Sequence, residues 1–280
     1  MNLPKLENKF VLLLPWLLFG FGVSVVFRSD TEIRVQFERA HDFWRTGDHT
    51  ASAVLYRRIV EHYPESDFAA QALWEIGTIQ YINLGQIDRA SESYRTIVSR
   101  YPDHPRAVHS LRRLAEIQEV DFQDDERAVD YWKQLLKKSL QPEERSEALF
   151  RLGNAWFNLR DLDRSQSVFD ELVKSPTLSA YLRQQVTFRL GTIFQLRELY
   201  GEAIPYFEDA LAAPDCGQCR LAAQLGLIES YEFLGDLETA LLVAANIDEA
   251  VYPSPSKQQL LVRLEQKQRF FDPTKWTGTR

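Results

Sequence analysis

A repeat of 37 or 38 residues, which begins near residue 31, constrains the fold more than any other feature of the sequence. Four sets of side chains recur in one register. The aromatic set is Tyr56, Tyr94, Trp132, Phe169 and Phe207, and the small set is Ser52, Ala90, Ala128, Ser165, Ala203 and Ala240. The aliphatic set is Ile59, Ile97, Leu135, Leu172, Ala210 and Ile247, and a fourth, largely aromatic set is Phe43, Tyr81, Glu119, Trp156, Phe194 and Tyr231. Self-similarity at a fixed period of this length indicates repeated structural units.

The spacing inside each unit predicts a helical hairpin. Ala90, Tyr94 and Ile97 recur at i, i+4 and i+7, which places them on one face of an α-helix. Gly85 marks the turn before this helix, where glycine takes the left-handed conformation that ends helices. Prolines close the units at Pro64, Pro102, Pro142, Pro176, Pro214 and Pro253. One hairpin cannot bury both of its faces, so we expect an all-α fold, an α-solenoid of about six stacked hairpins.

The repeat domain is predicted over residues 31–250. Its units are expected at about 31–65, 66–103, 104–141, 142–177, 178–215 and 218–250. The third is irregular, because Glu119 and Gln123 replace the expected aromatic residue and glycine. Residues 256–271 have leucines at helical spacing, which predicts a C-terminal capping helix. Residues 1–9 and 272–280 are expected to be tails.

The repeat resembles the tetratricopeptide repeat (TPR) family. The family's pattern is matched by Trp74, Tyr81, Leu84, Gly85, Ala90, Tyr94 and Pro102, and again by Leu152, Gly153, Trp156, Leu159, Ser165, Phe169 and Pro176. The period is longer than the usual ~34 residues. In this it is similar to the bacterial envelope branch, which includes outer-membrane assembly lipoproteins and periplasmic coordinators of cell division. The resemblance implies a periplasmic scaffold that binds other envelope proteins.

Residues 10–27 form an apolar run of 18 residues without a charge, flanked by Lys9 and Arg28. As a helix this run spans ~27 Å, close to the ~30 Å of a hydrocarbon core. We therefore predict a transmembrane anchor; a cleaved signal peptide and a core helix are the alternatives. No cysteine follows the run, so the lipid-accepting cysteine of the lipoprotein members is missing. Flanking positive charges are nearly balanced, and we expect a single-pass protein of the bacterial inner membrane with its repeats in the periplasm.

Composition and motifs argue against catalysis. The formal net charge is −7, which gives no general attraction to nucleic acid. The sequence has no phosphate-binding glycine loop, no nucleophile elbow and no zinc-protease motif, so we expect no enzymatic activity, no cofactor, no metal and no small-molecule substrate. Cys216 and Cys219 form the only reactive-looking motif. We expect a loop disulfide there; an inert thiol pair and a metal or redox site are the alternatives.

The surface expected to bind partners is the concave groove, which the resemblance assigns to the first helix of each hairpin. By the register of the repeat, the candidate lining residues are Phe37, His41, Trp44, Glu75, Ile79, Ile82, Arg113, Phe150, Asn154, Phe157, Phe188, Thr192 and Gln195. Aromatic residues beside an amide suit an extended peptide or a partner helix. The alternative is that these aromatics only pack against the adjacent hairpin. The predicted function is a membrane-anchored scaffold for other proteins, with a cytoplasm-facing adaptor and a thiol redox protein as alternatives.

Overall fold

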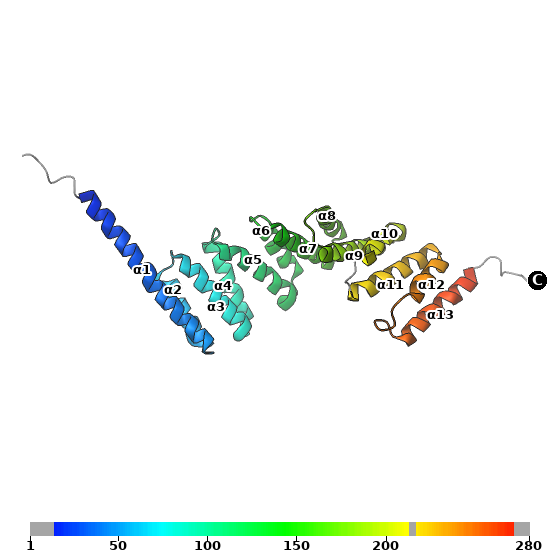
Figure 1. Cartoon of the computed structure of the whole chain (residues 1–280), viewed down its shortest axis with the longest axis horizontal. Helices are drawn as coiled ribbons and strands as arrows, with labels where there is room; N and C mark the ends of the chain where they lie inside the picture. The colour runs from blue at the N-terminus through cyan, green and yellow to red at the C-terminus, as the bar shows by residue number, and fades with distance from the viewer. Residues whose placement is uncertain (1–13, 213–216, 272–280) are drawn as a thin grey trace, which may run out of the picture. The chain divides into compact units, whose positions relative to one another are not determined.

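The computed structural model describes the backbone of residues 14–212 and 217–271 and the side chains of residues 30–212 and 220–270. Every regular element in these ranges is a helix (Figure 1), so the predicted all-α fold of helical hairpins is confirmed. The α-helices are α1 (Leu14–Arg45), α2 (His49–His62), α3 (Asp67–Thr78), α4 (Ile87–Arg100), α5 (Pro105–Ile117), α6 (Asp125–Leu136), α7 (Pro142–Asn158), α8 (Leu162–Val173), α9 (Ala180–Leu196), α10 (Tyr200–Ala212), α11 (Gly217–Leu234), α12 (Leu237–Ala245) and α13 (Ser254–Phe271). Two π-helices, η1 (Ile79–Asn83) and η2 (Gln118–Phe122), follow α3 and α5.

The chain divides into two compact units, Met1–Phe122 (unit 1) and Gln123–Arg280 (unit 2). In each unit, every helix packs against the next one along the chain, from α1 to α5 and from α6 to α13. First helices of successive hairpins also contact each other: α1 contacts α3, α3 contacts α5, α7 contacts α9 and α9 contacts α11. This packing gives each unit one layer of first helices and one of second helices. Residues 256–271, expected to cap the repeat, belong to α13, which packs on α12.

The three sets of small, aromatic and aliphatic residues form the core. Their members lie on the second helix of each hairpin or just after it, and each is at most 2% exposed. Burying such aromatic and aliphatic side chains contributes roughly 1.5–3 kcal/mol each, so the sequence repeat is a repeat of core positions. The fourth set lies near the end of each first helix and is mostly half-buried.

Three members of the aromatic set fit against glycines of the first helices. A Cβ atom at Gly77 would lie 2.7 Å from Tyr94 Cε1, and one at Gly191 would lie 2.8 Å from Phe207 Cε1. Gly153 stands in the same relation to Phe169. The missing side chain therefore lets the two helices of one hairpin approach closely, with the ring filling the gap.

Each hairpin turn contains one residue in the left-handed conformation. These residues are Gly47, Gly85, Gln123, Arg160, Glu198 and Gly235, with φ between 53° and 86°. An aspartate follows four of them and caps the second helix: Asp48, Asp124, Asp161 and Asp236 each accept a hydrogen bond from the backbone amide three residues later. The turn is thus conserved in conformation even where glycine is replaced, and the cap stabilises the helix by ~1 kcal/mol.

The N-terminal prediction falls largely outside the described residues. Helix α1 continues without interruption from Leu14 to Arg45. Among the described residues, no helix is both long enough and apolar enough to cross a membrane. The predicted anchor covers residues 10–27, and its first four residues and all of its side chains lie outside the description. It therefore stays a prediction, as do the tails at 1–9 and 272–280.

Candidate partner-binding surface

The candidate surface is formed by first helices, and its residues are located by the small residue that each first helix carries in its core face. These small residues are Ala40, Gly77, Ala115, Gly153 and Gly191. The residue three positions earlier is Phe37, Trp74, Arg112, Phe150 or Phe188, and the residue one position later is His41, Thr78, Glu116, Asn154 or Thr192. We call these side chains, together with those at the ends of the same helices, the first-helix face.

Two predicted residues of the second hairpin need correction. Ile79 is 1% exposed and belongs to the core of unit 1, so it offers no surface to a partner. The position equivalent to Phe37 is occupied by Trp74 rather than by Glu75. The ring of Trp74 lies 5.2 Å from the ring of Tyr94, as Phe37 lies 4.9 Å from Tyr56.

The cause is the π-helix. The interval between the small residue and the aromatic residue of the same hairpin is 16 residues in the first, fourth and fifth hairpins but 17 in the second and third. The extra residue lies in η1 and η2, where a wider helical turn absorbs it. A fixed interval counted back from the aromatic set therefore selects Glu75 and Arg113, one position beyond Trp74 and Arg112.

The predicted phenylalanines are mostly packing residues. Phe150 and Phe188 are half-buried, and their rings lie 6.1 Å from Phe169 and 6.0 Å from Phe207. Phe37 packs in the same way and also lies 5.8 Å from Phe68. One aromatic residue on the first helix thus covers the aromatic residue on the second in four hairpins. This supports the packing alternative for these side chains.

The exposed part of the face lies at the ends of the first helices. Twelve residues before the aromatic set lie Trp44, Ile82 and Val120 in unit 1, and these side chains are 41%, 66% and 67% exposed. Trp44 lies on α1, while Ile82 and Val120 lie on η1 and η2, which directly follow α3 and α5. The first helices are neighbours, because α1 contacts α3 and α3 contacts α5. Unit 1 therefore presents three large apolar side chains at equivalent positions of successive hairpins, which we call the apolar row. His41 is also exposed, with its ring 5.5 Å from that of Trp44.

In unit 2 the equivalent positions are covered. Phe157 is half-buried with the Arg189 guanidinium 5.0 Å from its ring centre, and burial lowers the pKa of that guanidinium. Gln195 donates a hydrogen bond from Nε2 to the carbonyl oxygen of Gly226 at 3.3 Å. The candidate surface is therefore apolar in unit 1 and polar in unit 2.

Charged groups of the face are paired within unit 1. Arg106 lies 3.8 Å from Glu75 and 5.2 Å from the ring of Trp74. Burial raises the pKa of Glu75, although Arg106 and His41 act to lower it. Arg113 donates to Glu116 at 2.8 Å. Because each positive charge lies beside a negative one, these pairs produce little net electrostatic field at the apolar row.

Asn154 provides a hydrogen-bonding group in unit 2. Its Nδ2 donates to the carbonyl oxygen of Phe150 at 3.1 Å, while its Oδ1 is buried without a partner among the described residues. Thr192, at the equivalent position of the next hairpin, satisfies itself by donating to the carbonyl of Phe188. Asn154 therefore has an acceptor available for a backbone amide or other donor.

Metal binding and thiol chemistry are the remaining candidate functions. Among the described residues, no three His, Cys, Asp or Glu side chains are placed to hold a metal ion. Cys216 lies outside the described residues, and so does the side chain of Cys219, so their predicted disulfide stays a prediction. Burial raises the pKa of Tyr56, which is a core residue and offers no surface to a substrate.

Tandem helical hairpins with an exposed row of equivalent apolar side chains define a repeat protein suited to binding other proteins. The sequence model of the tetratricopeptide repeat family matches residues 37–105 and 119–180. The match confirms tetratricopeptide repeats over these two stretches, as the resemblance indicated. Comparison with curated proteins finds no significant match.

Solved structures share this fold at low sequence identity. A tetratricopeptide repeat protein from Parabacteroides merdae is 18% identical, with a TM-score of 0.56 over 86% of this chain and 89% of its own. PilF of Pseudomonas aeruginosa is 16% identical, with a TM-score of 0.53 over 84% of this chain and 98% of its own. YrrB, described as having an unusual peptide-binding site, is 14% identical, with a TM-score of 0.55 over 75% of this chain and 97% of its own. These likenesses establish the fold.

Proposed function

We propose that this protein is a membrane-anchored scaffold of the bacterial inner membrane, which binds other envelope proteins on the periplasmic side through the first-helix face. The observation that carries the binding role is the apolar row. Trp44, Ile82 and Val120 are exposed at equivalent positions of three successive hairpins. Large apolar side chains in a row expose a surface that association with a partner would bury.

The spacing of the apolar row favours a helical partner. Packed helices lie 8–10 Å apart, so a partner crossing α1, α3 and α5 meets one apolar side chain at about this interval. Residues seven apart on a helix lie on one face and are separated by ~10.5 Å. An amphipathic helix with apolar residues at i, i+7 and i+14 therefore matches Trp44, Ile82 and Val120 in order.

The anchor is supported by the sequence and by the course of α1. Residues 10–27 carry no charge, and α1 runs unbroken from Leu14 into the first hairpin. An anchor in this position would join the repeats without a flexible linker. A similarly folded protein, PilW, is described as a type IV pilus biogenesis factor, and at 15% identity with a TM-score of 0.50 it serves as an example of what this fold can do.

Site-specific photo-crosslinking tests the binding surface. A photoreactive amino acid replaces Ile82 or Val120 in the full chain, in its native membrane, and Val262 on α13 is the matched control because it is 50% exposed and lies outside the first-helix face. We expect one discrete adduct from positions 82 and 120 that is absent at position 262. The same adduct at all three positions, or none at 82 and 120, would contradict binding through the apolar row.

Membrane attachment and side are tested separately. Intact mass of the membrane-extracted protein reports whether residues 1–27 are retained, and trypsin digestion of spheroplasts reports the side on which the repeats lie. We expect the full mass and digestion before lysis. Protection until lysis would favour the cytoplasm-facing adaptor. Replacing Cys216 and Cys219 by serine should leave the crosslinks unchanged, since the proposal gives the thiols no functional part.

A further inference from the structure

The second helices of unit 1 carry a cleft with a basic rim. A pocket of about 400 Å³ lies between α2, α3 and α4, with Arg57 on α2 and Arg89 on α4 among its lining residues. Both arginines are exposed, and neither forms an ion pair within the described part of the chain. Arg89 donates only to the side chain of Gln86, at 3.2 Å. We call this pocket the basic cleft.

The floor of the basic cleft is apolar and its polar groups are satisfied. Val60, Leu73 and Ile76 line it, and Ser93 donates to the Oε1 atom of Gln80 at 2.8 Å. Glu92 is the one carboxylate at its edge. Two guanidinium groups over an apolar floor fit a partner that presents carboxylates on either side of a small apolar surface.

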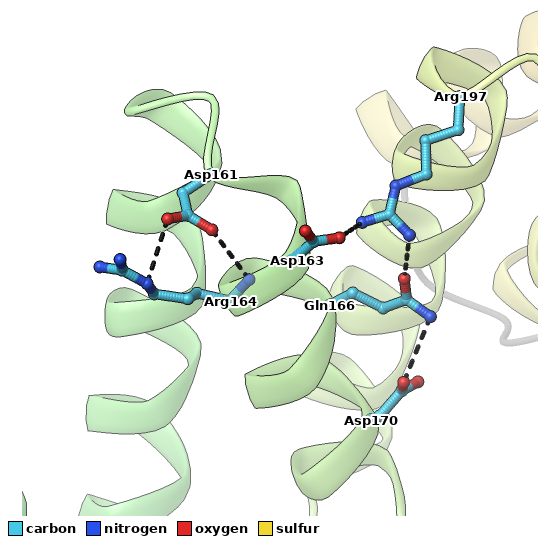
Figure 2. A network of polar contacts seen from close by, with 6 residues as sticks. All are labelled: Asp161, Asp163, Arg164, Gln166, Asp170 and Arg197. Atoms are coloured by element: carbon cyan, nitrogen blue, oxygen red, sulfur yellow. Dashed lines mark hydrogen bonds and ion pairs between the residues drawn. The ribbon is translucent and has the colours of Figure 1, made fainter.

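The second helices of unit 2 have the opposite charge. In α8 and at its N-cap, three of the four carboxylates already have partners: Figure 2 shows Asp163 and Gln166 bound by Arg197, Asp170 beside Gln166, and Asp161 beside Arg164. Helix α10 differs, because it has three carboxylates and no basic residue. Its acidic groups are therefore better placed than those of α8 to receive an external cation.

The exposed face of α10 matches the basic cleft. Glu202 and Asp209 are exposed and form no ion pair among the described residues. They are seven residues apart, which places them on one face at a separation of ~10.5 Å. Pro205 lies between them and is exposed, so a short apolar ring separates the two carboxylates.

We propose that α10 of a second copy of this chain docks in the basic cleft, with Glu202 and Asp209 facing Arg57 and Arg89. The two sets of charges are complementary, and none of the four groups forms an ion pair among the described residues. The contact uses different surfaces on the two copies. Because its charges lie at the rim and are exposed, the association should weaken with salt, which screens beyond ~10 Å at 0.1 M.

Charge reversal tests the pairing. The full chain is kept in non-ionic detergent with micelles in large excess, and self-association is measured by sedimentation velocity at low and high salt. The cleft variant is Arg57→Glu/Arg89→Glu, and the helix variant is Glu202→Lys/Asp209→Lys. We expect each alone to raise the dissociation constant at least about tenfold. An equal mixture of the two should recover wild-type association, because opposite charges face each other again.

The control is Arg34→Glu/Arg269→Glu, which changes the net charge as the cleft variant does, but on exposed residues outside both surfaces. This control should associate as the wild type does. Glu92→Gln provides a second measurement that leaves the arginines in place, and it should strengthen association. A wild-type chain that stays monomeric at low salt, a mixture that fails to recover, or a control as weak as the cleft variant would overturn the proposal. None of these outcomes depends on the first-helix face.

Discussion

Substituting Gly191 by alanine tests whether the aromatic set and the glycines of the first helices determine the close approach of the two helices in a hairpin. The added Cβ would lie 2.8 Å from Phe207 Cε1, where ordinary contacts begin at 3.4 Å, so it is too close by 3.4 − 2.8 = 0.6 Å. The ring has no free side to move into, because a Cβ at Gly226 on α11 would lie 2.6 Å from Phe207 Cζ.

Two opposing effects set the magnitude. Alanine in a helix interior is favoured over glycine by about 1 kcal/mol. Overpacking a tight core costs about 1–3 kcal/mol. We therefore expect Gly191→Ala to destabilise the protein by about 0–2 kcal/mol. The matched control is Gly201→Ala on α10, where no atom lies within 4 Å of the added Cβ, and it should stabilise by about 0.5–1 kcal/mol.

Urea unfolding followed by circular dichroism measures both variants. Phe207→Leu shortens the ring side chain, so Gly191→Ala should cost less in that background, with a coupling free energy of about 1 kcal/mol or more. If Gly191→Ala stabilised the protein as much as Gly201→Ala did, the ring would not be what requires a glycine at this position, and the explanation of the repeat would be wrong.

Three further predictions concern the turns and loops. Glu198→Gly should raise the free energy of unfolding by up to about 1 kcal/mol, measured by urea titration, because Glu198 has φ of 61°. Tyr101→Phe should lower it by about 1 kcal/mol in the same assay, since the Tyr101 hydroxyl donates to the carbonyl of Pro64 at 2.7 Å. His104 caps α5 by accepting from the amide of Arg106 at 3.1 Å, and burial lowers its pKa below the ordinary 6.5. The contribution of this cap to the free energy of unfolding is therefore present above pH 6.5 and lost as the pH falls below it. His104→Asn keeps a cap that does not titrate, so the free energy of unfolding should differ less between pH 7.5 and pH 5.5 than it does in the wild type.

The sequence was sufficient to predict the hairpins because the repeat consists of core positions. Tyr56, Tyr94 and Phe207 occupy equivalent buried sites, each at most 1% exposed, and a period of 37 or 38 residues was visible without any structure. Gln123, which stands where a glycine is expected, adopts the left-handed conformation that the turn requires. The helical hairpins can be predicted from such a pattern because each core contact recurs in successive repeats.

The surface was harder to predict, because exposure depends on neighbouring helices. The register selects Trp44 and Ile82, which are exposed, but it also selects Ile79, which is buried. A pattern of aromatic residues cannot distinguish Phe150, which packs on Phe169, from an exposed aromatic side chain that binds another protein. The basic cleft was missed for a different reason: Arg57 and Arg89 are 32 residues apart and belong to no motif.

The π-helices connect these two observations. The extra residue lengthens the spacing of the aromatic set to 38 residues, but the same spacing separates Phe169 from Phe207, whose hairpin has no π-helix, so the period alone does not reveal it. Only the interval from the small residue to the aromatic residue, 17 instead of 16, gives the signal. The wider turn shifts the residues before it by one position but restores the register after it, which is why Ile79 was misplaced and Ile82 was not. The two exposed aliphatic residues of the apolar row, Ile82 and Val120, both lie within these turns. The π-helices that shift the register of the first helices therefore lie in the surface proposed to bind the partner. Such a location is frequent for π-bulges, which often occur at functional sites.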